Sequence, residues 1–152
     1  MRVRAFEARD LVAWVEMRRA LWPDENAGEL AREAAKFSRT GEAFGLAAVL
    51  VSETATGQPT GFVEIGLRAY VDGCASSPVP YIEGWYVAEN ARRSGVGRAL
   101  IAAAEAWSLE RGHTELASDA LLDNRVSEAT HKALGFEEVE RAIRFRKTLR
   151  RP

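Results

Sequence analysis

The stretch YIEGWYV at residues 81–87, followed by RRSGVGR at residues 92–98, decides the fold expected for this chain. The first stretch is rich in aromatic and β-branched side chains, which is typical of a strand. The second places Gly95 and Gly97 among arginines, and the apolar run at residues 99–109 predicts a helix directly after it. A strand, a glycine-rich turn and the start of a helix are therefore expected in that order.

This turn is expected to bind a phosphate group. N–H groups at a helix N-terminus lack partners, and the helix dipole adds partial positive charge there. Glycine lets the backbone approach an anion closely, and arginine supplies charge. The turn lacks the complete dinucleotide fingerprint and the Gly-Lys-Ser/Thr ending of a P-loop, and a pyrophosphate is the natural ligand. The predicted binding residues are Arg92, Arg93, Ser94, Gly95, Val96, Gly97 and Arg98.

Hydrophobic periodicity outside this region predicts an α/β (α+β) fold in one domain, residues 1–152. Asp10 is expected to cap the first helix, and Gly41 to end the second. Along residues 61–70 polar and apolar side chains alternate, so one apolar face is expected. The predicted strands are residues 2–6, 46–53, 61–70, 81–87, 114–119 and 138–149, and the predicted helices are residues 10–21, 27–39, 97–111 and 125–134.

Composition excludes several classes of protein. The chain carries 21 basic and 22 acidic residues, a balance that argues against a nucleic-acid binder. Cys74 is the single cysteine, and no Cys/His cluster has metal-ligand spacing, so no metal site is expected. No signal peptide and no membrane-spanning stretch is visible. A cytoplasmic protein without a membrane partner is therefore expected, with Cys74 as an incidental loop thiol.

Two motifs together resemble the GNAT superfamily of acetyltransferases. Arg92-x-x-Gly95-x-Gly97 matches its coenzyme-A signature after the fourth strand, and Leu134-Gly135-Phe136 matches the usual end of its last helix. The resemblance implies a mixed twisted sheet of about six strands flanked by four helices, and acetyl-CoA as the cosubstrate.

A narrower resemblance covers nearly the whole chain. Fragments in the same order and spread are similar to aminoglycoside 6′-N-acetyltransferases, which move an acetyl group to the drug's 6′-amine. These fragments lie at residues 21–23, 64–68, 70–73, 77–79, 81–84, 117–120 and 134–136. The resemblance implies direct transfer in a ternary complex, and hence a role in antibiotic resistance.

The GNAT resemblance also implies where the donor and the base lie. The pantetheine arm of CoA would run along Tyr86 and Val87, with an N–H near Val87 polarising the thioester carbonyl. The acceptor amine must lose a proton before it attacks, which a carboxylate can remove directly or through water. Glu83 is the first candidate and Asp119 the second. The alternatives are an acid on a solvent face for Glu83 and a turn or capping acid for Asp119.

The acceptor side is expected to be acidic, because aminoglycosides are polycations. Trp22 and Tyr70 could pack against sugar rings, although a core role for Trp22 is an equal alternative. The predicted substrate-binding residues are Trp22, Asp24, Glu64, Tyr70, Asp72, Glu83 and Asp119.

The sequence departs from the superfamily pattern in two places. The superfamily often has a tyrosine, proposed to protonate the departing thiolate, where this chain has His131; a histidine could act there, or simply pack. Asn124 is expected to contact pantetheine. A single closing strand at residues 138–149 would leave a sheet edge exposed, so a homodimer is expected.

Competing functions share most of these features. A GNAT enzyme could take another amine, such as a polyamine, an amino sugar or a peptide N-terminus. A CoA-binding regulator would keep the fold without catalysis, although Glu83 and Asp119 count against it. A nucleotide-binding module is disfavoured by the missing P-loop residues.

Overall fold

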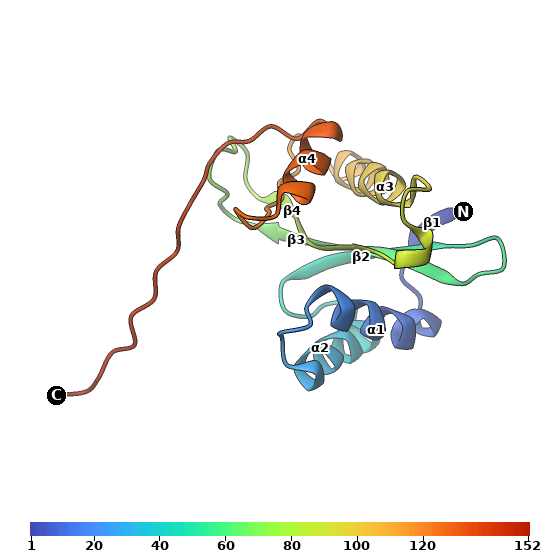
Figure 1. Ribbon diagram of the computed structural model, residues 1–152, viewed down its shortest axis with the longest axis horizontal. Coiled ribbons are helices and arrows are strands. Elements are labelled where there is room, and N and C mark those ends of the chain that lie inside the picture. The colour runs from blue at the N-terminus through green and yellow to red at the C-terminus, as the bar shows by residue number, and fades with distance from the viewer. The chain divides into compact units, whose positions relative to one another are not determined.

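The computed structural model describes residues 1–152, which divide into two compact units, residues 1–119 and residues 120–152. The first unit is built on an antiparallel sheet with strand order β1-β2-β3-β4. Figure 1 shows helices α1 and α2 on one face of this sheet and α3 on the other. The strands are β1 (Arg2–Ala5), β2 (Leu46–Glu53), β3 (Pro59–Arg68) and β4 (Val79–Val87). The helices are η1 (Ala8–Asp10), α1 (Leu11–Leu21), α2 (Ala27–Thr40), η2 (Glu89–Ala91) and α3 (Val96–Glu110).

The ends of α2 follow directly from its sequence. The Asn26 side chain accepts a hydrogen bond from the Glu29 N–H at 2.9 Å, which caps the N-terminus. Gly41 ends the helix in the left-handed conformation (φ 74°) that glycine adopts without strain, as predicted.

The predicted cap at Asp10 is wrong in its detail. Asp10 occupies the N-cap position of α1, but its side chain makes no capping bond to that helix. The carboxylate instead accepts bonds from the Arg4 guanidinium at 2.7 and 2.9 Å and from the Glu7 N–H at 2.8 Å. Arg4 and the Glu7 N–H therefore occupy the carboxylate that was expected to cap α1, and the two bonds from Arg4 are strong because they are charge-assisted.

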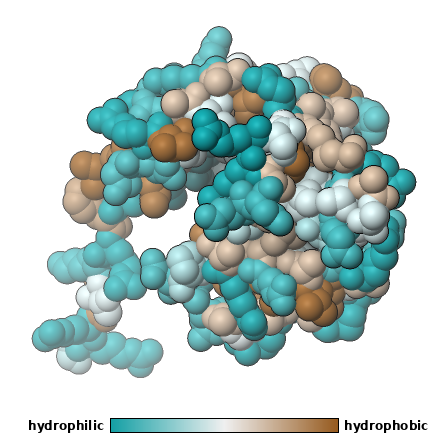
Figure 2. Space-filling model, turned by 45° about the vertical axis from the view of Figure 1, so that its right-hand side comes forward, coloured by the Kyte–Doolittle hydropathy of each residue, from teal (hydrophilic) through white to brown (hydrophobic).

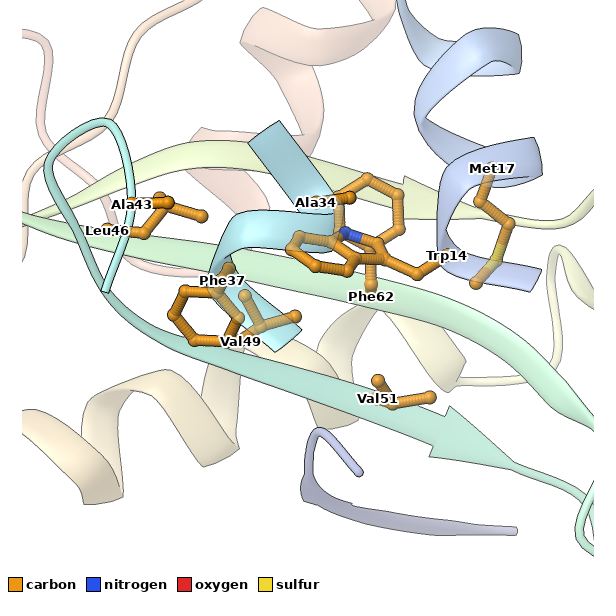
Figure 3. Packing of buried hydrophobic residues seen from close by; sticks show 9 residues of the cluster. All are labelled: Trp14, Met17, Ala34, Phe37, Ala43, Leu46, Val49, Val51 and Phe62. Atoms are coloured by element: carbon orange, nitrogen blue, oxygen red, sulfur yellow. The ribbon is translucent and has the colours of Figure 1, made fainter. Parts of the chain in front are cut away.

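The sheet is buried on both faces along β3, whereas the alternating pattern predicted one apolar face. Phe62, Val63 and Ile65 are all fully buried, since helices cover each side. Trp14 packs against Phe6 and Phe37, with ring centroids 5.0 and 5.6 Å apart. Figure 3 shows Trp14 and Phe37 in the cluster beneath α1 and α2. Burying each such side chain stabilises the fold by roughly 1.5–3 kcal/mol.

The predicted strand at residues 114–119 is reduced to a single bridge. Ala117 pairs in parallel with Tyr81 of β4. Its carbonyl accepts from the Ile82 N–H at 2.8 Å, and its own N–H donates to Pro80 O at 2.9 Å. The rest of the segment makes no ladder, so the sheet of this unit has four strands rather than about six.

The second unit contains helix α4 (Arg125–Ala133) and a long segment without regular structure. The strand predicted at residues 138–149 is wrong: these residues form no strand, and their side chains are exposed. Alternation alone does not make a strand, because a ladder also needs a neighbouring strand to accept its hydrogen bonds.

The face of the molecule shown in Figure 2 carries mainly hydrophilic side chains. On the face shown in Figure 2 the hydrophobic side chains occur in small separate groups. None of the helices is both long enough and apolar enough to cross a lipid bilayer.

Candidate active site

A β-bulge in β4 places Glu83 on the face of the sheet that α1 covers. On β3 and β4, Glu64 pairs with Gly84 and Ile65 pairs with Ile82, so Glu83 has no partner in the ladder. A bulge adds one residue and re-aims its side chain, and bulges are over-represented beside active sites. The ideal Cβ of an alanine at Gly66 would lie 2.7 Å from Glu83 Oε1, so the carboxylate sits directly over this glycine.

Arg68 holds the Glu83 carboxylate with both arms of its guanidinium. Nε donates to Oε1 at 2.9 Å and Nη2 donates to Oε2 at 2.7 Å. The Glu83 side chain is 29% exposed and that of Arg68 is 39% exposed, so both remain open to solvent. The bond to Glu83 is the main reason that the pKa of Arg68 rises above its ordinary value.

Tyr81 connects this ion pair to the second candidate carboxylate. The Arg68 guanidinium carbon lies 3.4 Å from the centroid of the Tyr81 ring, a close cation–π contact. The Tyr81 hydroxyl donates to Asp119 Oδ2 at 2.5 Å. Burial first, and then the bond to Asp119, raise the pKa of Tyr81, so the phenol keeps its proton as a donor. The structure thus brings Glu83 and Asp119, the two candidate bases, into one cluster.

Trp22 lies against the strand next to Glu83. A Cβ at Gly84 would be 2.7 Å from Trp22 Cη2, so the indole packs directly on the glycine backbone. Trp22 is half-buried, and the Arg18 guanidinium carbon lies 5.2 Å from the centroid of its ring. This position agrees with both readings of Trp22, since it packs against the interior and also borders the Glu83 cluster.

Glu64 was expected to line the acceptor pocket, whereas its carboxylate lies in the interior of the unit. It is 1% exposed and accepts bonds from Arg18 Nε at 2.8 Å and Trp14 Nε1 at 3.1 Å. Arg18 also donates to Leu30 O at 2.6 Å and pairs with Glu33 at 3.0 Å. Burial raises the pKa of Glu64 to about 7, and Arg18 opposes that rise. These partners account for Glu64 as a structural group.

The start of α3 has the features expected of an anion site. Gly95 is the N-cap residue, with φ 86°, and no side chain caps the helix. The first helical bond runs from the Ala99 N–H to Gly95 O, so the N–H groups of residues 96–98 have no acceptor within the helix. Arg93 has a left-handed φ of 62° and, like Ser94 and Arg98, is exposed. The backbone and charges here fit a pyrophosphate.

The outer edge of β4 is open beside this site. The parallel bridge ends at Tyr81 and Ile82, and no strand pairs with residues 84–87 on that side within the first unit. Tyr86 and Val87, the predicted pantetheine contacts, lie on this stretch. Arg92 folds back over it: its Nε donates to Val87 O at 3.0 Å, and its guanidinium carbon lies 5.7 Å from the centroid of the Tyr86 ring. An extended chain could add to such an edge through backbone hydrogen bonds.

Comparison with known proteins agrees with this geometry. The model of the acetyltransferase (GNAT) family matches residues 11–136. The chain belongs to the GNAT family. Curated relatives include an aminoglycoside N(6′)-acetyltransferase type 1 of Klebsiella aerogenes, 45% identical over 97% of this chain and 96% of the relative. One of the same name from Stenotrophomonas maltophilia is 42% identical over 97% of this chain and 93% of its own length.

Solved GNAT structures superpose closely. AAC(6′)-Iy in complex with the bisubstrate analogue CoA-S-monomethyl-acetylneamine has a TM-score of 0.86 and 35% identity, covering 97% of this chain and 98% of that one. An apo aminoglycoside antibiotic 6′-N-acetyltransferase from Acinetobacter haemolyticus has a TM-score of 0.85 and 35% identity, covering 98% and 99%. The GNAT fold predicted from two short motifs is therefore confirmed.

Other predicted site residues of this GNAT chain lie at the surface. Asp24 and Asp72 are exposed, and Tyr70 is 75% exposed with its hydroxyl donating to Asp72 Oδ1 at 2.8 Å. An open hollow lined by Met1, Arg2, Arg9, Glu53 and residues 54–57 holds none of the predicted site residues. The charges and hydrogen bonds around Glu83, rather than the depth of a pocket, mark the candidate site.

Two residues of the GNAT pattern lie in the second unit. His131 Nδ1 is 2.7 Å from Ser127 O, and its ring packs edge-on against Phe136 with centroids 5.2 Å apart. Asn124 caps α4 by accepting from the Ser127 N–H at 3.0 Å. Each residue therefore has a structural role. The expected roles of His131 and Asn124 toward the donor stay predictions.

The sequence analysis missed Arg68 and Tyr81 as members of this GNAT site. Arg68 stands two residues before Tyr70 and Tyr81 two residues before Glu83, and both Tyr70 and Glu83 were predicted site residues. The signal available was the shared face of residues 66 and 68, since alternate residues of a strand point the same way. No pattern in the sequence predicts the bulge that turns Glu83 toward Arg68 and Tyr81.

Proposed function

We propose that this chain transfers the acetyl group of acetyl-CoA to the 6′-amine of aminoglycosides, by direct transfer in a ternary complex. The single observation that carries the proposal is the bulged Glu83, held beside Tyr81 and Asp119 next to the open edge of β4. Nearly full-length relatives named aminoglycoside N(6′)-acetyltransferases support this acceptor.

The residues of the α3 start would hold the donor. N–H groups of residues 96–98 receive pyrophosphate oxygens, and Arg92, Arg93 and Arg98 balance their charge. Tyr86 and Val87 receive the pantetheine arm along the open edge of β4. Acetyl-CoA, when bound, supplies an acetyl thioester, and no metal is required for that chemistry.

Glu83 acts as the general base in this proposal. It accepts a proton from the acceptor ammonium, directly or through one water, so that the neutral amine nitrogen can form the new C–N bond as the C–S bond breaks. Asp119 holds a second positive charge of the polycation, and Asp24 and Asp72 extend the acidic surface toward it. Trp22 and Tyr70 offer flat faces to sugar rings. His131 and Asn124 are proposed to return a proton to the thiolate and to contact pantetheine, respectively.

A substrate panel with detection of free thiol tests the proposal. Kanamycin and tobramycin should release CoA thiol far faster than spermidine or a peptide N-terminus, with acetyl-CoA alone as the background. A preference for spermidine or the peptide would favour the alternative that the enzyme acetylates another amine.

Calorimetric titration with CoA separates the non-enzymatic alternative. CoA binding with no turnover of any amine would identify a CoA-binding regulator. Absence of CoA binding would contradict every form of the proposal.

We further propose that residues 1–152 work as one GNAT domain and that two copies form a homodimer. The family match spans both compact units, which supports the single domain. Apolar side chains of residues 138–149 alternate along the chain and are exposed, Phe145 at 91%, which supports pairing with a second copy. Sedimentation at micromolar concentration should give the dimer mass; a monomer alone would contradict the dimer.

A cytoplasmic location is proposed on the presence of one cysteine, Cys74, which fits a reducing compartment. The partner is proposed to be a small polycationic amine, and the near-balanced charge argues against nucleic acid in that place.

A further inference from the structure

The proposed base is not a free carboxylate, because one guanidinium engages both of its oxygens. Arg68 donates to Oε1 and Oε2 of Glu83 at 2.9 and 2.7 Å in the two-pronged geometry that only arginine provides. Each oxygen keeps further lone-pair capacity, so a substrate nitrogen can still approach. It does so within a few ångströms of a fixed positive charge.

The surroundings of Arg68 keep that charge in place. Its guanidinium carbon lies 3.4 Å from the centroid of the Tyr81 ring, and Tyr81 is anchored through its hydroxyl to Asp119 at 2.5 Å. Gly66 leaves room for Glu83, since a Cβ there would meet the carboxylate at 2.7 Å. The carboxylates of Glu83 and Asp119 and the guanidinium of Arg68 are therefore linked to one another, with Tyr81 between Arg68 and Asp119.

A fixed cation has two opposing effects on an amine that arrives as an ammonium ion. It weakens the attraction of the acidic cluster for a polycation. It also disfavours the charged form of a nearby amine, so the ammonium loses its proton more readily. Only the neutral amine can attack the thioester, and the second effect therefore promotes the reaction.

We propose that Arg68 is a positioning residue that holds Glu83 and keeps a positive charge beside it. This charge lowers the affinity for the acceptor and makes it easier for the acceptor ammonium to lose its proton. This inference rests on the proposed function and deepens it. The acceptor affected by this charge is a polyamine-like cation, since a neutral acceptor has no extra proton to lose before it attacks.

The variant Arg68→Gln tests this assignment directly. The acceptor KM should fall about 5-fold, because the cluster gains a net negative charge. The kcat should fall about 10-fold at neutral pH and recover toward alkaline pH, where the amine loses its proton without help. A purely structural role predicts a lower kcat with an unchanged or higher KM and no change in the pH profile, and that result would overturn the inference.

Two further variants make the result specific. Arg39→Gln removes the same charge from the exposed end of α2 and should leave KM and kcat at wild-type values. Arg68→Lys keeps the charge but not the two-pronged bond, and should keep KM and the pH profile near wild type. If Arg68→Lys lowers KM as Arg68→Gln does, charge is not the cause. If Arg68→Gln does not fold, the Arg68→Lys profile alone decides.

Failure of the inference and failure of the proposed function have different signatures. Wild-type protein that acetylates no aminoglycoside contradicts the proposed function. Wild-type protein that acetylates kanamycin, with Arg68→Gln showing a raised KM, contradicts only the role of Arg68.

Discussion

Two arginine–glutamate pairs involve β3, and they differ in how deeply they are buried: Glu64 pairs with Arg18 of α1, whereas Arg68 pairs with Glu83 of β4. Glu64 and Arg18 are 1% and 3% exposed at their side chains, and an indole, a carbonyl and a second carboxylate saturate them. Glu83 and Arg68 are 29% and 39% exposed, beside an open strand edge. The inner pair is locked into the packing of α1, whereas the outer pair can respond to a substrate.

The largest expected effect separates the two pairs by activity. Glu83→Gln keeps the shape of the side chain but removes the base, so kcat should fall by about 10²–10⁴-fold. Affinity for CoA and the midpoint of thermal unfolding should stay near wild type, because the outer pair is open to solvent. Glu105→Gln, an exposed acid on α3, is the matched control and should leave kcat unchanged. Unaltered kcat in Glu83→Gln would place the base elsewhere, with Asp119→Asn as the next variant to assay.

The second effect separates the pairs by stability. Arg18→Met leaves the Glu64 carboxylate buried without its cation, which should lower the free energy of unfolding by about 3–5 kcal/mol above pH 7. Arg68→Met breaks the exposed pair and should cost only about 0–1 kcal/mol. Urea denaturation of both variants provides the measurement. Equal losses in the two variants would mean that burial does not distinguish the pairs.

A third effect concerns the pH dependence of stability. Burial raises the pKa of Glu64 from 4.5 to about 7, so the folded chain binds more protons than the unfolded chain between these values. The stability contributed by this group is therefore fully present below pH 4.5 and is lost as the pH rises through about 7. In Glu64→Gln this slope should be absent. Urea denaturation across this window gives the comparison, and an identical slope in wild type and variant would refute it.

The smallest effect concerns the contact that joins the two pairs. Trp22 packs on Gly84 between Glu64 and Glu83, and a Cβ there would lie 2.7 Å from Trp22 Cη2. Gly84→Ala should therefore cost about 1–3 kcal/mol by overpacking and raise the acceptor KM as the indole moves. Gly28→Ala is the control, since its Cβ would meet only two exposed side chains, Arg32 at 3.2 Å and Asn26 at 3.3 Å. Thermal unfolding and steady-state kinetics of the two variants give the comparison. Equal stability of Gly84→Ala and Gly28→Ala would mean that the Trp22 side chain moves aside at little cost.

The sequence predicted the parts of this molecule that depend on local chemistry. The strand at residues 46–53, the glycine that ends α2 and the glycine-rich start of α3 all follow from side-chain preference and backbone freedom over a few residues. Glu83 lies on a strand as expected, and Asp119 follows the single bridge that replaces the strand expected at residues 114–119. Hence the fold family could be predicted from the sequence, whereas the roles of the two acids stay predictions.

The remaining features depend on long-range partners that periodicity does not report. Glu64 was expected in the acceptor pocket because its charge suits a polycation, yet its carboxylate lies in the interior, bonded to Arg18 46 residues away in sequence. Residues 138–149 alternate like a strand and form none. The contact of Arg68 with Glu83 could not be predicted from the sequence, because it depends on the bulge that turns Glu83 toward Arg68.

The bulge at Glu83 also bears on how this acid could be gained or lost in the gene. On either side of Glu83, residues 82 and 84 pair with consecutive residues of β3, as in an uninterrupted ladder. Removing this one residue would leave every neighbouring pair in phase and a sheet with no acid at that point. Deletion of one codon would therefore remove this acid without changing the register of any other pair between β3 and β4.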